Sequence, residues 1–245
     1  MSLEGSNYKK EQIFWVLSGF FLASMAMLNI IGLTKFVSIF GLTVAVGVLP
    51  YPITFLCTDL ISEIYGKKRA NFLVFLGLFI NIFVLFFMWF GDALPSVPVE
   101  ARPPWQDLNL SQPITLPNGQ MISGETELFG IIFATTSGAV LASMVAYMFA
   151  QFCDVYIFHY LKELTNGKYM WLRNNASTLV SQFVDSLAVV GITFGAVFVK
   201  GQMDFSILLT LFWSNYAFKM IAALLDTPFF YLFTHLIKKQ IEVKA

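Results

Sequence analysis

Six long stretches of this chain are almost free of charged residues, and each is long enough to cross a lipid bilayer. A helix needs roughly 20 mostly apolar residues to span about 30 Å of hydrocarbon. The stretches cover about residues 13–33, 36–61, 71–90, 129–160, 176–199 and 205–237. Pro50 and Pro52 interrupt the second one, and the fourth and sixth exceed what a bilayer requires. The sequence therefore predicts an all-α polytopic membrane protein, with six transmembrane helices in a single domain of residues 1–245.

The composition agrees with a membrane protein and excludes other classes. Of the 245 residues 57% are hydrophobic and only 12% are charged, whereas a soluble domain carries about 25% charged residues. Fifteen basic residues balance fifteen acidic ones, so there is no basic field for nucleic acid. Cys57 and Cys153 lie in apolar surroundings, and His159 and His235 are too few and too far apart for a metal site. We therefore expect no metal, no cofactor and no nucleic-acid partner.

The positions of lysine and arginine predict the orientation, because these residues collect on the cytoplasmic side of membrane proteins. Only Lys35, Arg102 and Lys200 fall on one side, and Lys219 lies inside an apolar stretch. The other side, with both termini, holds Lys9, Lys10, Lys67, Lys68, Arg69, Lys162, Lys168, Arg173, Lys238, Lys239 and Lys244. Both termini are therefore expected in the cytoplasm.

A long loop, residues 91–128, lies on the predicted outer side and is rich in proline and acidic residues. Residues 114–116 and 120–122 are short apolar segments that flank Pro117-Asn118-Gly119. This pattern predicts a small β-hairpin with a tight turn. The loop is either a surface feature without a role of its own or a lid over the outer entrance of an internal site.

Polar residues recur inside the apolar stretches, where ionisable groups are costly and are functional candidates by default. They fall on single helical faces in the last three stretches, and the first and third stretches add one amide each. The residues are Ser143, Tyr147, Gln151 and Asp154; Asn174, Thr178, Ser181, Gln182 and Asp185; Asn215, Lys219 and Asp226; and Asn29 and Asn81. Gln151-Phe152-Cys153-Asp154 and Gln182-Phe183-Val184-Asp185 share the pattern Q-F-x-D, which suggests a weak internal repeat of the kind found in transporters.

Two interpretations of these polar faces remain open. In the structural one, amides hydrogen-bond between helices and Lys219 neutralises Asp154 or Asp185. In the functional one, carboxylates and amides bind a small, flat ligand with adjacent N–H donors and a carbonyl, such as a guanine-type edge; amino acids or ions suit the composition equally well. The predicted substrate-binding residues are Asn29, Asn81, Gln151, Asp154, Gln182, Asp185, Asn215 and Lys219.

The end of the second stretch carries Asp59 and Glu63, four residues apart on one helical face. Glu63 and Lys67 are also four apart and can pair. The segment is either a salt-bridged helix end or a gate or proton-handling pair at the cytoplasmic mouth.

The run PITFLCTDLISEIYGKKRA, residues 52–70, closely resembles the motif of the queuosine precursor transporter family, also called the vitamin uptake transporter family. Further matches follow in order at Gln151 and Asp154, at residues 171–186, and at Tyr216, Lys219 and Thr227-Pro228. The resemblance implies a six-helix importer of 7-deazaguanine bases in the bacterial inner membrane. It maps the polar positions of the family onto Asp59, Glu63, Gln151, Asp154, Arg173, Gln182, Asp185 and Lys219.

The function expected from the resemblance and the polar faces is import of 7-cyano-7-deazaguanine or a related base by alternating access. Asp59, Glu63 and Arg173 are expected to act in gating or proton coupling. The alternative is a substrate-capture subunit of a multi-component uptake system. An enzyme is not expected, because the chain has no Walker A, HExxH or GxSxG pattern. The expected partners are the base and the lipid bilayer; a homodimer and the coupling mode stay open.

Overall fold

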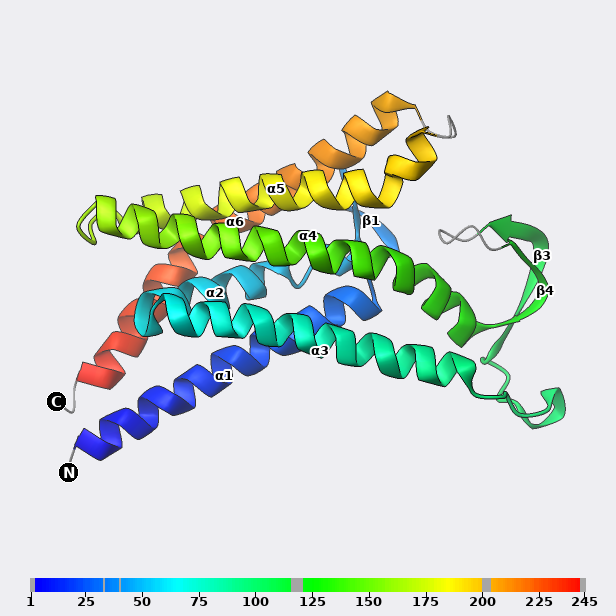
Figure 1. The fold of residues 1–245 in the computed structure, drawn as a ribbon, viewed down its shortest axis with the longest axis horizontal. Coiled ribbons are helices and arrows are strands. Elements are labelled where there is room, and N and C mark those ends of the chain that lie inside the picture. Colours follow the sequence, from blue (N-terminus) through cyan, green and yellow to red (C-terminus); the bar gives the residue numbers. More distant parts are fainter. Residues whose placement is uncertain (1–2, 33, 40, 116–120, 200–203, 243–245) are drawn as a thin grey trace.

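The computed structural model describes residues 3–32, 34–39, 41–115, 121–199 and 204–242. For some residues within these ranges, Ser143 among them, the structure describes the backbone but not the side chain. An elongated helical bundle makes up most of the described part (Figure 1). Its helices are α1 (Leu3–Ile30), α2 (Tyr51–Tyr65), α3 (Lys67–Ala93), α4 (Leu128–Leu164), α5 (Met170–Val199) and α6 (Phe205–Glu242).

The second apolar stretch does not form the single helix expected over residues 36–61, and that prediction is wrong. Strand β1 (Phe36–Ile39) pairs antiparallel with β2 (Leu42–Ala45), and a 3-10 turn, η1 (Val46–Val48), leads into α2. Proline lacks a backbone N–H and is best tolerated in the first turn of a helix, so Pro50 and Pro52 mark where α2 begins. The 15 residues of α2 extend only about 22 Å, less than the thickness of the hydrocarbon core.

The turn after β2 lies against α1 through a close contact between two glycines. The Gly47 N–H donates to the Gly32 carbonyl at 3.2 Å. A Cβ placed on Gly47 would lie 2.5 Å from the Gly32 Cα, so the two backbones can approach this closely only because residue 47 has no side chain. This contact fixes where the β1–β2 hairpin and the start of α2 sit relative to α1.

Three helices of the described part are long and apolar enough to cross a membrane: Tyr8–Ile30, Lys67–Ala93 and Phe205–Ile241. The outer face of α3 is densely aromatic, with Phe72, Phe79 and Trp89 more than half exposed. Contiguous exposed apolar surface of this extent is unsuited to water and suited to lipid. The molecule is therefore a helical membrane protein, whereas the number of spans remains a prediction.

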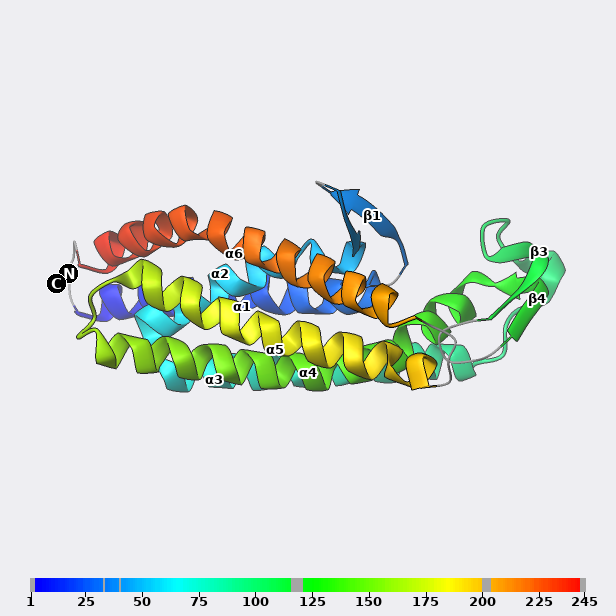
Figure 2. The same ribbon diagram turned by 90° about the horizontal axis from the view of Figure 1, so that it is seen from above.

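Both termini lie at one end of the bundle, and a second hairpin lies at the other (Figures 1 and 2). After the 3-10 turn η2 (Val99–Ala101), β3 (Asp107–Thr115) pairs with β4 (Met121–Glu127) from Thr115↔Met121 to Asp107↔Glu127. The two strands pair at Ile114↔Ile122 and Thr115↔Met121, within the predicted small hairpin, and their pairing continues well beyond it. The predicted turn at Pro117-Asn118-Gly119 lies outside the described residues.

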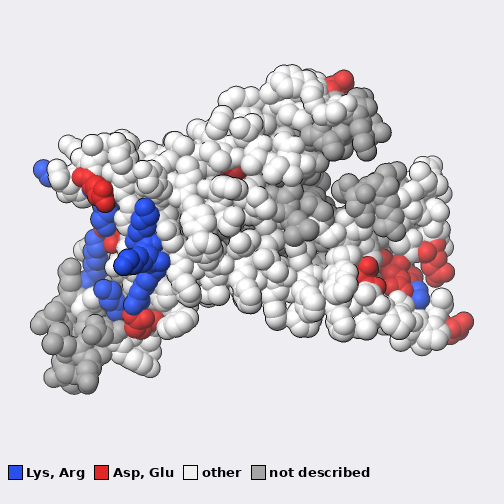
Figure 3. All heavy atoms as spheres, in the orientation of Figure 1, with Lys and Arg blue, Asp and Glu red and all other residues white. Residues whose placement is uncertain are grey.

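Charge is segregated between the two ends of the bundle (Figure 3). Lysine and arginine gather at the end that carries the termini, and acidic residues predominate around the β3–β4 hairpin. There Arg102 bridges Asp107 at 2.9 Å and Glu127 at 3.0 Å, which joins the loop to both strands. The middle of the visible face is almost uncharged, as expected for a surface in contact with lipid.

The short helix α2 is the central element of the bundle. It contacts α1, α3, α4 and α6, and most of its length from Thr54 to Ser62 is buried. Helices α4, α5 and α6 pack against one another in sequence order. The polar faces predicted on α4, α5 and α6 therefore have α2 as a neighbour, and this sets up the internal site.

Candidate binding site

A cavity of about 150 Å³ lies inside the bundle, where the end of α1, the β1–β2 hairpin and the start of α2 meet α4, α5 and α6. Much of its wall is aliphatic and comes from Leu28, Val44, Val48, Val140, Val190 and Leu211. Its polar lining comes from Asn29, Tyr51, Thr136, Tyr147, Asn215 and Lys219. A mostly apolar cavity with a few polar groups is the usual form of a small-molecule site.

Lys219, which forms the polar floor of this cavity, belongs to a buried ion pair whose other member lies outside the lining. The Lys219 ammonium on α6 donates a hydrogen bond to the Asp185 carboxylate on α5, and both side chains are 1% exposed. The ammonium also lies over the Tyr51 ring, 4.4 Å from its centroid, in a cation–π contact. Asp185, not Asp154, is thus the partner of Lys219 and neutralises it.

A second group of carboxylates lies in the bundle away from the cavity lining. Asp154 on α4 accepts a hydrogen bond from the Ser181 hydroxyl on α5 at 3.1 Å. The carboxyl group of Asp59 on α2 lies within hydrogen-bonding reach of Asp154 and is also near Asp226 on α6. A hydrogen bond between two carboxyl groups requires a proton on one of them. Asp59 therefore interacts with Asp154, and not with Glu63 on its own helix.

The remaining predicted substrate residues are buried but do not line the cavity. Gln151 on α4 and Gln182 on α5 each have a side-chain carbonyl oxygen without a hydrogen-bond partner among the described residues. Asn81 is buried on α3, and neither polar atom of its amide has a partner within the same ranges. The structure thus places Asn29, Asn215 and Lys219 in the cavity lining and Asp185 outside it, against Lys219. It leaves Gln151, Asp154, Gln182 and Asn81 elsewhere in the bundle.

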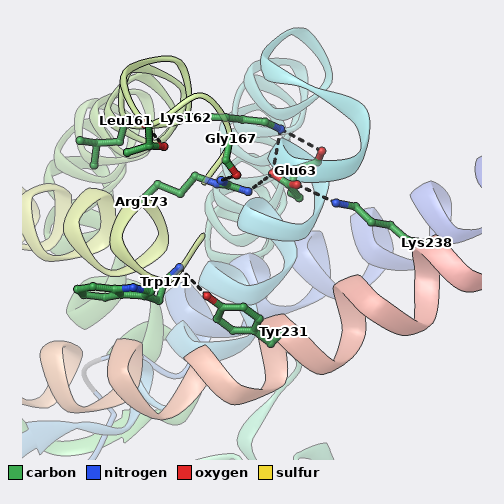
Figure 4. A network of polar contacts seen from close by, with 9 residues as sticks. Glu63, Leu161, Lys162, Gly167, Trp171, Arg173, Tyr231 and Lys238 are labelled. Carbon is green, nitrogen blue, oxygen red and sulfur yellow. Dashed lines mark hydrogen bonds and ion pairs between the residues drawn. The ribbon is translucent and has the colours of Figure 1, made fainter. Parts of the chain in front are cut away.

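Glu63 accepts hydrogen bonds from three cations at the end of the bundle that carries the termini (Figure 4). The donors come from three other helices: Lys162 of α4 at 2.9 Å, Arg173 of α5 at 2.8 Å and Lys238 of α6 at 2.9 Å. Arg173 is itself 2% exposed and donates a further bond to the Gly167 carbonyl at 2.9 Å. We call Glu63, Lys162, Arg173 and Lys238 the Glu63 cluster, and it ties four helices together.

The charges around Glu63 decide its protonation. Burial by itself would raise the pKa of Glu63, but the hydrogen bonds from Lys162 and Lys238 and the charges of Lys162 and Arg173 outweigh it. The pKa of Glu63 is therefore lowered from its ordinary value. The carboxylate in the Glu63 cluster stays ionised at neutral pH.

The pairing of Glu63 with Lys67 expected from their spacing does not occur. Helix α2 ends at Tyr65, and Gly66 has φ +82°, so Lys67 begins a new helix and loses the i,i+4 geometry. The Lys67 ammonium lies instead over the Tyr156 ring, 4.9 Å from the centroid. The prediction failed because the glycine turn falls between the two residues.

Several residues of the site are not among those predicted from sequence. Lys162 and Lys238 enter the sequence prediction only through the orientation of the chain, and Tyr51 only as part of the second apolar stretch. Tyr147 and Asp226 lie on the predicted polar faces but are not among the predicted substrate-binding residues. The spacing on α4 placed Tyr147 on the face of Gln151, four residues away, and this signal could have identified it.

An apolar outer surface, buried polar groups and an internal cavity together define a helical membrane protein with a candidate small-molecule site. The family described as "Putative vitamin uptake transporter" matches residues 45–233, which include every predicted site residue except Asn29. The chain belongs to this family, which is one of transporters. It is also 29% identical over 198 residues to a protein of Bacillus subtilis (strain 168) named "Probable queuosine precursor transporter". The match covers 80% of this chain and 74% of that protein. No solved structure matches the chain.

Proposed function

We propose that this chain imports a queuosine precursor, 7-cyano-7-deazaguanine or a related 7-deazaguanine base, across the bacterial inner membrane. The observation that carries the proposal is the cavity with the buried Lys219–Asp185 pair at its floor. The name of the Bacillus subtilis relative supports the same substrate class. Both termini would lie in the cytoplasm, together with the basic end of the bundle.

The polar groups of the cavity complement the edge of a guanine-type base. Such an edge presents two neighbouring N–H donors beside a carbonyl oxygen, which suit a carboxylate or amide oxygen and an ammonium group. Asn215 would accept one N–H donor, Lys219 would donate to the carbonyl, and Asn29 would bind at the side of α1. Asp185, which lies outside the lining against Lys219, would accept the second N–H donor once the site opens. The Tyr51 and Phe36 rings, which also line the cavity, offer faces for stacking.

The size of the cavity supports a site that opens during transport. A dry cavity of about 150 Å³ holds one benzene-sized ring, whereas a deazaguanine has two fused rings and a substituent. Binding the base would therefore require the surrounding helices to separate, as alternating access demands. Gln151, Asp154, Gln182 and Asn81, which are buried outside the lining, would contact the base at other stages of its passage.

Gating would depend on the polar groups outside the cavity. The Glu63 cluster joins α2, α4, α5 and α6 at the basic end, so opening that end would require breaking the contacts of Glu63 with Arg173 and its neighbours. The carboxyl pair Asp59 and Asp154 would carry a proton if transport is proton-coupled. The sequence predicts Asp59, Glu63 and Arg173 for gating or proton coupling, whereas it predicts Asp154 for substrate binding.

Uptake of radiolabelled 7-cyano-7-deazaguanine tests the proposal in cells that lack an importer of their own. Cells expressing the wild type should accumulate label, and Asp185→Asn should abolish uptake because it removes the acceptor charge at the cavity floor. Asp92→Asn, at an exposed position near the end of α3, is the matched control and should transport normally. Protein levels in the membrane are compared with a fluorescent fusion. Normal uptake by Asp185→Asn would contradict the proposal.

The alternative is a substrate-capture subunit that depends on an energising partner. Uptake by purified protein in liposomes distinguishes the importer from the capture subunit, because no energising partner is present there. Uptake into these liposomes supports an importer that works alone. Binding of the base without uptake supports the capture subunit.

A further inference from the structure

Two buried polar atoms of the cavity lining have no hydrogen-bond partner within the described part of the chain: the Tyr147 hydroxyl and the Asn215 side-chain oxygen. Asp185 Oδ1, the carboxylate oxygen that does not bind Lys219, is also without a partner among the described residues, but Asp185 does not belong to the lining. Tyr147 is 5% exposed, lines the cavity from α4 and belongs to the same core cluster as Phe21 and Met25.

Other polar groups of the lining are satisfied within their own helices. The Thr136 hydroxyl donates to the Ile132 carbonyl at 2.6 Å, and the Asn29 amide donates to the Met25 carbonyl at 3.2 Å. The Tyr147 hydroxyl and the Asn215 oxygen therefore differ from these two groups of the lining. Buried polar groups are costly when unpaired, so a native site that keeps several of them is one that a ligand completes.

The chemistry of these atoms specifies what the ligand must present. An amide oxygen only accepts, so Asn215 requires an N–H donor. The Tyr147 hydroxyl can donate or accept. A ligand with N–H groups along one edge meets both requirements, whereas a purely apolar ring meets neither.

The charges of the cavity specify the net charge of the ligand. Lys219 is neutralised by Asp185 outside the lining, and no carboxylate belongs to the described lining itself. A charged ligand would be desolvated in this cavity without a counter-charge, which is costly. An uncharged ligand avoids this penalty.

We propose that Tyr147 and Asn215 bind the N–H donors of an uncharged heterocycle, so that the cavity prefers the 7-cyano base over its cationic 7-aminomethyl counterpart. This inference rests on the proposed function for the choice of bases. It assigns Tyr147 to ligand recognition and names the neutral form as the favoured substrate.

The first test removes only the hydroxyl of Tyr147. In purified protein, Tyr147→Phe should bind 7-cyano-7-deazaguanine about tenfold more weakly, which corresponds to the loss of one hydrogen bond. Without ligand its thermal midpoint should stay the same or rise, because an unpaired buried hydroxyl is gone. Tyr216→Phe is the matched control, since the Tyr216 hydroxyl donates to the Leu179 carbonyl at 3.4 Å and does not line the cavity. Equal affinities of the two variants, or a lower midpoint of Tyr147→Phe without ligand, would overturn the assignment.

The second test varies the ligand on the wild-type protein. Guanine and 7-methyl-7-deazaguanine, which are neutral and keep the N–H edge, should compete with the labelled 7-cyano base. The 7-aminomethyl base should compete at least tenfold less well. Equal competition by the 7-aminomethyl base would overturn the charge preference, and failure of every neutral base to bind would overturn the inference as a whole. These assays measure binding, so an importer that fails in cells but binds neutral bases through Tyr147 would contradict only the proposed function.

Discussion

At the scale of single residues, the Lys219–Asp185 pair shows how a buried charge is tolerated inside a membrane bundle. Each partner is almost fully buried, and a lone charge at such a depth would be strongly unfavourable. The hydrogen bond between them and the Tyr51 ring over the ammonium offset part of the cost of desolvation. The pair is therefore neutral as a unit, and its stability depends on both members.

Replacement of one partner should destabilise the protein more than replacement of both. Lys219→Met leaves a buried carboxylate uncompensated and should lower the free energy of unfolding by about 3–5 kcal/mol. The double variant Lys219→Met with Asp185→Leu should recover most of that loss, because no buried charge remains, but it should not bind the base. Thermal unfolding in detergent measures the first effect and ligand binding the second. A double variant no more stable than Lys219→Met would contradict this account.

At the scale of elements, one carboxylate at the end of α2 holds the ends of three longer helices. Glu63 lies next to a glycine turn, so α2 stops and exposes its last residues to α4, α5 and α6. Each ion pair of the Glu63 cluster joins α2 to a different helix. The cluster therefore responds to how these helices sit relative to one another.

Acid should weaken this cluster, and the direction follows from the lowered pKa of Glu63. The pKa of Glu63 is lower in the folded protein than in the unfolded chain, where it is near 4.5. Such a carboxyl group stabilises the fold at pH values above its unfolded pKa. This contribution is lost as the pH falls through its folded pKa. Glu63→Gln should therefore unfold at a lower temperature than the wild type at pH 7, and the difference should narrow below pH 4.5. Thermal unfolding at several pH values measures it. Glu163→Gln, at an exposed position of α4, should match the wild type throughout; a constant difference for Glu63→Gln would contradict the assigned cause.

At the scale of the whole molecule, the two ends differ in charge and in structure. The termini and the Glu63 cluster lie at the basic end, and the β3–β4 hairpin lies at the acidic end (Figures 1 and 3). In bacterial membrane proteins basic residues near helix ends stay in the cytoplasm. The hairpin should therefore face the outside.

Cysteine labelling tests this orientation. In a variant without Cys57 and Cys153, Ser111→Cys in the exposed part of β3 should react with a membrane-impermeant maleimide in intact spheroplasts. Lys239→Cys near the end of α6 should react only after the membrane is opened. The reverse labelling pattern would show that the hairpin faces the cytoplasm, and it would reverse the direction assigned to transport.

The sequence by itself determined the class of the molecule and the sets of residues available for its site. Apolar runs, the bias of lysine and arginine, and the polar faces around Asp154, Asp185 and Lys219 are local or periodic signals, so they can be read without a structure. The motif around Asp59 and Glu63 indicated the family, which the comparison with known families confirms.

Only the tertiary structure decided which of these residues meet. Lys219 had two candidate partners on different helices, and the rotation and depth of α5 and α6 select Asp185. Glu63 had a candidate partner four residues away, but the Gly66 turn removes it and helices far along the chain supply three others. The cavity likewise depends on the β1–β2 hairpin, which an apolar run broken by Pro50 and Pro52 did not reveal. Pairing across helices depends on packing, and packing is a property of the whole chain that no single segment encodes.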